Sequence, residues 1–223
     1  MPSTVLKQLL KQRHSVRGFL NKEVTPELLE EIFTLAQHAV SNCNTQPWKT
    51  FVASANVKDN LKRNLVNTVM TNTKPESDFQ YYSDFKGEHQ VRQIECAKAL
   101  YHAMGVERGN KAERKQALLR NYEFFGAPHV AIICMPTSFE INNALDIGIY
   151  LQSLMLIMES FGIGSCAQGA LSFYPQIIKD TLNIPESMGV LVGLSFGYED
   201  KSQLANNART SRAMLSDSVT FLS

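Results

Sequence analysis

One long apolar segment in the last third of the chain limits the possible folds more than any other feature. The stretch from 147 to 161 is apolar with few interruptions, the polar ones being Gln152, Ser153, Glu159 and Ser160. A helix that crosses a membrane needs about 20 uninterrupted apolar residues, so we expect no membrane span. A helix over 143–161 would be apolar nearly all round, which predicts burial on every side or a place at a subunit interface.

The composition is that of an ordinary globular chain with almost no net charge. Among 223 residues, 22 Lys and Arg nearly balance 21 Asp and Glu, which leaves a formal charge of +1. A near-neutral chain has no general affinity for nucleic acids or for a membrane surface. We therefore expect neither as a partner, and any local cluster of basic residues needs a local anion to explain it.

The cysteines and the first residues indicate the compartment. The four cysteines lie far apart and form no CxxC pair: Cys43, Cys96, Cys134 and Cys166. This spacing argues against a zinc site or a disulfide framework and fits a reducing compartment. The first residues also lack the pattern of a secretion signal. We expect a cytoplasmic protein without a bound metal.

Apolar periodicity and breaking residues predict the order of helices and strands. Thr25 and Pro26 mark the clearest helix start, as the N-cap and the first helical residue. We expect helices over 3–12, 26–39, 57–70, 91–104, 111–125, 143–161 and 174–182. We expect strands over 48–53, 129–135, 163–167 and 190–196. Because strands and helices do not alternate regularly, the pattern predicts an α+β fold, with residues 1–223 in one domain.

Two segments lack the periodicity of a core element. Residues 71–90 are polar and aromatic, with Pro75 and Gly87 as breakers, and we interpret them as a long loop or lid. Residues 203–223 are polar with scattered apolar side chains, so we expect an extended C-terminal arm.

Two short segments at opposite ends of the chain concentrate basic residues. The first reads RHSVR at 13–17, and the second reads RTSR at 209–212. Guanidinium forks and hydroxyl donors at such spacing can bind one phosphate or one anionic ring. A solvated basic helix end and a solvated tail are the alternatives, and the residues alone do not separate them.

Two further segments are polar or small where a core element would be apolar. Residues 39–48 read AVSNCNTQPW, which offers donors and acceptors for a polyol or the edge of a heterocycle. Residues 162–170 read GIGSCAQGA, and such small residues let a flat ligand approach the backbone. The second is not a GxGxxG fingerprint and does not indicate a Rossmann domain. Ordinary turns remain the alternative for both.

The other reactive residues form no recognisable catalytic pattern. The five histidines have no metal-ligand spacing, and no Gly-x-Ser-x-Gly elbow occurs. Cys43 and Cys166 lie within the polar and glycine-rich segments, where small packing residues explain them equally well. The sequence therefore offers no catalytic side chain of its own.

The order and spacing of these segments are more specific than any one of them. Arg-His-Ser-x-Arg-x-Phe at 13–19, a Thr-Pro-Glu helix start at 25–27 and Ser-x-x-Asn-x-Gln-Pro-Trp at 41–48 resemble the opening of the FMN-dependent nitroreductase family. NYEFFGAP at 121–128, the apolar helix, the glycine-rich turn and the basic tail follow in the family's order. The resemblance covers nearly the whole chain and is nearest to the branch that includes nitrobenzoate reductases.

The resemblance implies an α/β sandwich that forms a homodimer, with a mixed central sheet in each subunit. The long apolar helix would lie at the interface, and the C-terminal arm would reach the partner subunit. One FMN would bind in each interface cleft, with NADH or NADPH as the reductant. The implied partners are a second copy of the chain and a small aromatic acceptor.

The resemblance assigns FMN contacts to six residues of the two basic segments: Arg13, His14, Ser15, Arg17, Arg209 and Arg212. The first arginine and the serine would bind the phosphate, together with one or both of the C-terminal arginines. The histidine would lie beside the phosphate and the ribityl chain. Arg17 would reach the N1/O2 edge of the flavin ring.

The polar and glycine-rich segments are assigned the remaining contacts by the same resemblance. Ser41 and Asn44 would come from the other subunit, and Gln46 would also bind the cofactor. The backbone around Gln168 and Gly169 would donate to flavin N5 or O4. No side chain is assigned a catalytic role, because flavin N5 would carry the hydride.

The implied activity is ping-pong hydride transfer from NAD(P)H, through flavin N5, to a nitroaromatic or quinone-like acceptor. A cation near N1, for which Arg17 is the candidate, would stabilise the reduced anionic flavin. Two alternatives remain open. One is another flavin enzyme of this scaffold, such as a reductive dehalogenase or a flavin-fragmenting enzyme, and the other is a non-catalytic flavin-binding protein.

Overall fold

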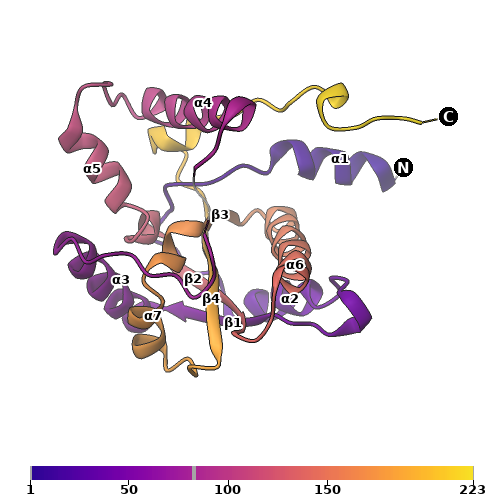
Figure 1. Ribbon diagram of the computed structural model, residues 1–223, viewed down its shortest axis with the longest axis horizontal. Coiled ribbons are helices and arrows are strands. Elements are labelled where there is room, and N and C mark those ends of the chain that lie inside the picture. Colours follow the sequence, from indigo (N-terminus) through magenta and orange to yellow (C-terminus); the bar gives the residue numbers. More distant parts are fainter. Residues whose placement is uncertain (1, 82–83, 223) are drawn as a thin grey trace.

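A small antiparallel sheet lies at the centre of the molecule. The computed structural model describes residues 2–81 and 84–222. Its sheet has four strands in the order β1-β2-β4-β3, surrounded by helices (Figure 1). The expected α+β class is confirmed. From β1 to β4 the strands span Lys49–Ser54, His129–Pro136, Gly164–Gln168 and Met188–Gly197.

The expectation of a mixed sheet is wrong for the described residues. Every neighbouring strand pair there is antiparallel. Strands β2 and β3 run in the same direction, but β4 lies between them and runs the opposite way. This insertion of β4 prevents a parallel ladder. Within the described ranges, the one parallel pairing is an isolated bridge between Ser15 and Ser165.

Helices cover both faces of the sheet. One layer contains α3 and α7, which contact each other, and the opposite layer contains α2 and α6. The first of these helices in the chain, α2, begins as predicted, with the Thr25 hydroxyl accepting a hydrogen bond from Leu28 N. The four helices α2, α3, α6 and α7 span Pro26–Ala36, Ala55–Met70, Ile141–Ser160 and Pro175–Leu182.

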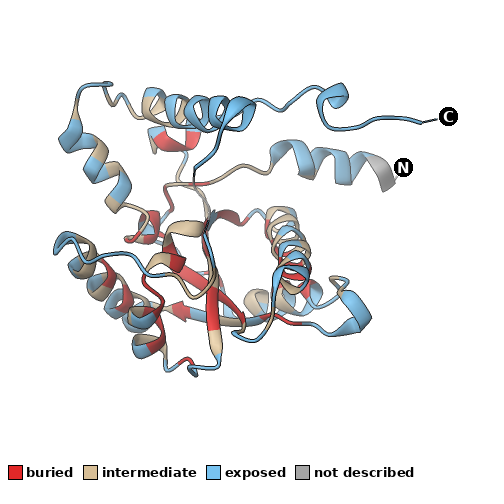
Figure 2. Cartoon of the chain, viewed as in Figure 1, coloured by how far each residue is buried: buried red, intermediate tan, exposed pale blue. Residues whose placement is uncertain are grey.

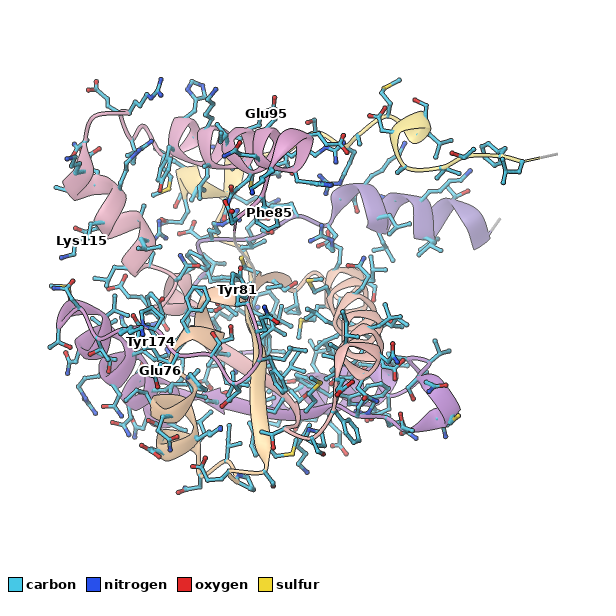
Figure 3. All side chains as sticks on the ribbon, in the orientation of Figure 1. Glu76, Tyr81, Phe85, Glu95, Lys115 and Tyr174 are labelled. Carbon is cyan, nitrogen blue, oxygen red and sulfur yellow. The ribbon has the colours of Figure 1, made fainter. Side chains whose placement is uncertain are left out.

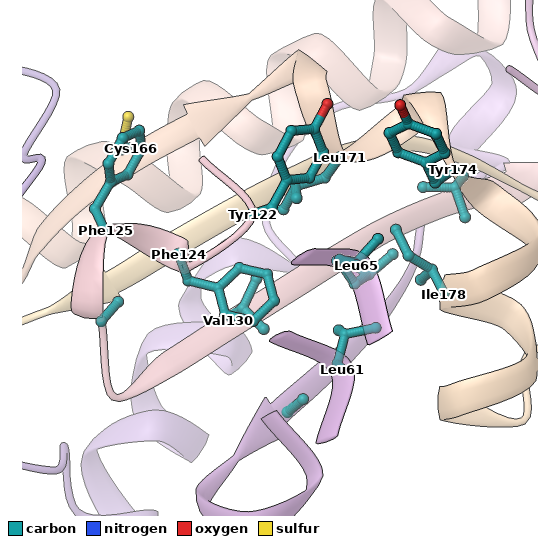
Figure 4. Close-up of a cluster of buried hydrophobic side chains, with 14 of the residues drawn as sticks. Leu61, Leu65, Tyr122, Phe124, Phe125, Val130, Cys166, Leu171, Tyr174 and Ile178 are labelled. Atoms are coloured by element: carbon teal, nitrogen blue, oxygen red, sulfur yellow. The ribbon is translucent and has the colours of Figure 1, made fainter. Parts of the chain in front are cut away.

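Strand β2 contributes side chains to both layers. Alternate residues of a strand point to opposite faces, so Val130 and Ile132 join the cluster under α3 and α7, which Figure 4 shows. Ala131 and Ile133 join the cluster under α2 and α6. All four are fully buried, which identifies β2 as the centre of the core.

Two helices differ most from their expected ranges. The helix expected over 111–125 ends early, since α5 spans Lys111–Leu119. Phe124 and Phe125 are buried and adopt φ of 55° and 54°. Burial of these two rings outweighs both helix continuation and the steric cost of positive φ. The other difference is α4, which spans Gly87–Ala103 and so takes the last residues of the expected 71–90 loop.

The apolar helix α6 is buried on one face only. The buried face consists of Asp146, Ile147, Tyr150, Leu154 and Met158. Ile141 and Leu145 are 82% and 67% exposed, so the chain alone does not bury the helix on every side. By length and composition α6 could cross a membrane, yet here its buried face packs on the sheet. The predicted place at a subunit interface stays a prediction.

The molecule divides into two halves that differ in burial (Figure 2). The sheet half contains the sheet with α2, α3, α6 and α7. The outer half contains α1 (Pro2–Gln12), α4, α5 and residues 207–222. Neither α4 nor α5 contains a buried residue, and residues 209–222 are all exposed. The expected C-terminal arm is thus an extended segment, interrupted by 3-10 turns at Leu204–Asn207 (η4) and Leu215–Asp217 (η5).

Candidate functional site

The two basic segments from opposite ends of the chain meet at one cavity. Its volume is about 320 Å³, and it lies where the chain leaves α1 and the C-terminal segment passes α4. The cavity lining includes all six residues of these segments that the sequence singled out: Arg13, His14, Ser15, Arg17, Arg209 and Arg212. We name these six residues the basic cluster. The structure brings them together, and their contacts with a ligand stay a prediction.

A larger cavity of about 720 Å³ adjoins the first, between α4 and residues 209–217. The two cavities share Cys96, Arg209, Thr210 and Arg212. The larger one is also lined by the acidic residues Glu88, Glu95 and Asp217, whereas no carboxylate lines the smaller one in the described part of the chain. The smaller cavity is therefore the better candidate for an anion.

Strand-like pairing with β3 places the first basic segment. Val16 N donates to Ser165 O at 3.0 Å, and the Val16 side chain is buried. Since alternate residues of an extended segment face opposite sides, Ser15 and Arg17 turn away from the core and line the cavity. Gly164 permits the close approach, because a Cβ there would lie 2.7 Å from Val16 Cγ2.

The arginines of the basic cluster have no carboxylate partner among the residues that the structure describes. The side-chain hydrogen bonds of Arg17, Arg209 and Arg212 in the described residues all start from Nη1. All but one of them end on main-chain carbonyl oxygens. The cluster thus carries guanidinium charges that no ion pair compensates. Such a set of forked donors favours an anion with several oxygen acceptors.

A carboxylate at the edge of the cluster pairs with the histidine instead. His14 Nε2 lies 3.1 Å from Glu199 Oε1, and Nδ1 lies 3.0 Å from Gln12 O. Both side chains are largely shielded from solvent. The imidazole therefore engages this carboxylate, and the neighbouring arginines remain available.

The polar segment lies apart from the basic cluster and is internally bonded. Ser41 Oγ accepts from Gln46 N at 2.9 Å, and Gln46 Nε2 donates to Asn44 O at 3.1 Å. Asn44 and Gln46 both adopt positive φ, 56° and 46°, a strained conformation that is common at ligand sites. The buried Asp146 holds the loop by accepting from Asn42 N. The structure does not bring this segment to the cluster within one chain, so its assignment to a partner's cofactor stays a prediction.

The glycine-rich segment at 162–170 contains strand β3 and the first two residues of the short helix η3 (Gly169–Phe173). Gln168 is buried, and its Nε2 donates to Asn121 O at 2.8 Å while its Oε1 accepts from the Ser195 hydroxyl. The side chain is therefore used inside the fold. Gln168 also pairs with Gly193 in the ladder between β3 and β4. The predicted contact of its main chain with a ligand stays a prediction.

The loop before α4 is fastened to the sheet half through one buried ion pair. Lys179 Nζ lies 2.9 Å from Asp78 Oδ1, and Val190 N donates to Asp78 Oδ2 at 2.8 Å. Burial lowers the pKa of Lys179, but the hydrogen bond and charge of Asp78, with help from Glu186, outweigh it and raise the pKa. The first part of the expected loop or lid is thus held against the sheet half at Asp78, and its role as a lid stays a prediction. Residues 82 and 83 lie outside the described ranges.

This fastened loop carries Tyr81 to the glycine-rich turn. A Cβ on Gly169 would stand 3.3 Å from the Tyr81 hydroxyl, so the ring lies against that glycine. Tyr81 also meets Phe173 edge to face, with ring centroids 4.9 Å apart. Tyr174 donates to Thr73 O at 3.1 Å and closes the base of the loop. Figure 3 labels Tyr81 of this loop and Tyr174, which contacts the base of the loop.

The buried thiols are packing groups. Burial raises the pKa of Cys166, an effect that the nearby Arg17 charge opposes, and burial raises the pKa of Cys134 to about 12. A neutral thiol is a poor nucleophile. In the described ranges, no three His, Cys, Asp or Glu side chains lie close enough to hold a metal ion.

Sequence reasoning missed three residues that shape this region. Asp78 and Tyr81 lie in the 71–90 loop, where the absence of periodicity leaves side-chain directions undetermined. The aromatic content of that loop was the one available signal. Asn206, which contacts both basic segments, sits in an Ala-Asn-Asn sequence that resembles any polar turn.

The sequence of the chain also matches a known family. The profile of the nitroreductase family matches residues 10–198. The chain belongs to the nitroreductase family. This match confirms the family that the resemblance indicated, and it ends before the second basic segment at 209–212.

Individual nitroreductases align over nearly the whole chain. Nitroreductase NfnB of Mycolicibacterium smegmatis is 39% identical over 215 residues, which cover 96% of this chain and 91% of that protein. A 4-nitrobenzoate reductase of Pseudomonas putida is 30% identical, over 94% of this chain and 92% of that protein. The crystal structure of the FMN-dependent nitroreductase NfnB from Mycobacterium smegmatis in complex with NADPH superposes with a TM-score of 0.96 and 37% identity over the full length of both chains.

Proposed function

We propose that this chain is an FMN-dependent oxidoreductase that uses NADPH or NADH to reduce nitroaromatic or quinone-like acceptors. The basic cluster carries the proposal, because arginines from both ends of the chain line one cavity without a carboxylate partner in the described residues. Family membership and the FMN and NADPH of the Mycobacterium smegmatis relative support it.

The donors in and near the cavity fit FMN. A phosphate dianion needs several N–H and O–H donors, which Arg13, Arg209, Arg212 and Ser15 offer. When bound, FMN supplies the redox chemistry between reductant and acceptor, and the protein supplies binding, orientation and electrostatics. Arg17 is the candidate to stabilise negative charge at the N1/O2 edge of the ring.

The region around Gly169 suits the ring of the cofactor and a flat acceptor. Small residues let a planar group approach the main chain of Gln168 and Gly169, whose N–H groups would orient flavin N5. Tyr81 and Phe173 add aromatic surface beside that turn. Since reductant and acceptor would use this same face in turn, we expect ping-pong kinetics.

A homodimer would complete the site. Large apolar side chains remain exposed on α1, on α6 and on the C-terminal segment: Val5, Leu6, Leu10, Ile141, Leu145, Met214, Leu215, Phe221 and Leu222. Exposed apolar surface of this extent marks an interaction site. A second copy would cover it and would bring Ser41, Asn44 and Gln46 to the partner's cofactor.

An anaerobic redox titration tests the proposal. We expect a yellow protein that releases FMN on denaturation, that NADPH or NADH bleaches under argon, and that a nitrobenzoate then re-oxidises stoichiometrically. A colourless protein that takes up no added FMN would overturn the proposal. Bound FMN that neither nicotinamide reduces would instead indicate a non-catalytic flavin-binding protein.

A further inference from the structure

The side chain of Asn206 joins the two ends of the chain at the basic cluster. Asn206 is buried at the end of η4, and its Oδ1 accepts from Arg17 N at 2.6 Å. Its Nδ2 donates to Gly18 O at 2.8 Å and to Asp200 O at 2.9 Å. The side-chain amide of Asn206 thus bonds main-chain groups from segments about 180 residues apart. A buried main-chain group that loses its hydrogen-bond partner costs free energy of folding.

The same residue also holds the second basic segment. Arg209 Nη1 donates to Asn206 O at 2.5 Å. The main chain of Arg17 and the guanidinium of Arg209 are therefore both fixed to Asn206, one through its side chain and the other through its carbonyl. Among the described residues, no other side chain bonds the main chain of Arg17 to the segment that carries Arg209.

We infer that Asn206 is a positioning residue that sets the arrangement of the basic cluster and thereby its preference for a phosphate-bearing flavin. The inference rests on the proposed function. Two main-chain hydrogen bonds between the stretches beside these segments, from Leu20 N to Tyr198 O and from Asp200 N to Gly18 O, do not involve Asn206. They hold the segments side by side when its amide is removed, so its substitution perturbs the alignment of the arginines more than the fold.

The test compares FMN with riboflavin, which has the same ring and no phosphate. For Asn206→Ala we expect the FMN Kd to rise about tenfold, the effect of losing one to two hydrogen bonds, with a much smaller change for riboflavin. Asn207→Ala is the matched control, because that neighbouring amide is exposed and its side chain has no hydrogen bond in the part of the chain that the structure describes. It should bind both flavins like the unmodified protein.

The outcomes separate this inference from the proposed function. If the unmodified protein prefers FMN and Asn206→Ala keeps that preference in full, the inference is wrong and the proposed function stands. If the unmodified protein binds neither flavin, both are wrong. If Asn206→Ala strongly lowers the Tm, the comparison uses Asn206→Ser instead, because serine retains a polar group. An equal loss of affinity for both flavins in that variant would show a structural role only and would overturn the inference.

Discussion

The sheet half and the outer half of the molecule differ in how their side chains are covered. In the sheet half, strand β2 is buried from His129 to Met135, between helices on both faces. In the outer half, α4 and α5 contain no buried residue, and residues 209–222 are exposed. The chain therefore closes its own core but leaves open the region that contributes to the basic cluster.

This difference indicates that stability and function depend on different parts of the chain. Local stability follows buried apolar contacts, so global unfolding should be governed by the sheet half. The outer half has apolar side chains in solvent, and its Arg209 and Arg212 have no carboxylate partner in the described ranges. Such a surface fits the ligand and the second copy that we propose.

The largest effect is expected from a cavity in the core. Ile132 is fully buried, so Ile132→Ala should lower the free energy of unfolding by about 2–5 kcal/mol in urea titrations. Ile94→Ala in α4, where the side chain is 47% exposed, should change it by less than about 0.5 kcal/mol. An equal loss of unfolding free energy in the two variants would contradict the difference in stability between the two halves.

The second effect tests the fastened loop. Asp78→Ala leaves Lys179 buried without its closest partner and should cost about 3 kcal/mol. Asp84→Ala in the same loop is the control, because Asp84 is 75% exposed and meets Lys86 only at 3.9 Å. We also expect Asp78→Ala to raise the KM for a nitroaromatic acceptor and to leave FMN affinity unchanged. A KM equal to that of the control would mean that the loop does not position Tyr81 for the acceptor.

The third effect is a pH dependence that arises from a buried histidine of the sheet half. Burial lowers the pKa of His129, whose Nε2 accepts from Val24 N at 2.9 Å. In the unfolded chain the pKa of this histidine is near its usual value of about 6.5, whereas in the folded chain the histidine is protonated only at lower pH. The free energy of unfolding should therefore decline as the pH falls below about 6.5. His129→Gln should flatten that decline in urea titrations, and replacement of the exposed His38 should preserve it.

The smallest effect on stability is expected at the C-terminus. Phe221 and Leu222 are 84% and 92% exposed, so replacing both by Ser should change the free energy of unfolding by less than about 0.5 kcal/mol. Sedimentation should nevertheless show weaker self-association than for Thr220→Ala. Unchanged association would remove these side chains from the proposed interface.

The comparison also separates what the sequence could predict from what it could not. Local patterns located the core elements, because periodicity and the Thr25 cap act over a few residues. The order of motifs also indicated that 13–17 and 209–212 belong to one site. Phe124 and Phe125 were placed wrongly in a helix, since their burial against the sheet depends on residues distant in sequence.

The remaining misses have the same origin. The resemblance implied a mixed sheet, which is wrong for the described residues because β4 inserts between β2 and β3. Local patterns in the sequence do not show this insertion. The roles of Asn206 and Asp78 depend on contacts across more than 100 residues. A single polar residue in a turn looks the same whether or not such a contact exists.

Native mass spectrometry of the purified protein tests the shared site most directly. We expect one dominant species with two chains and two FMN, and no single chain that retains FMN. Release of FMN should accompany dissociation into single chains. A single chain that keeps its full complement of FMN, or a two-chain species that binds none at saturating FMN, would contradict the proposal that a second copy completes the site.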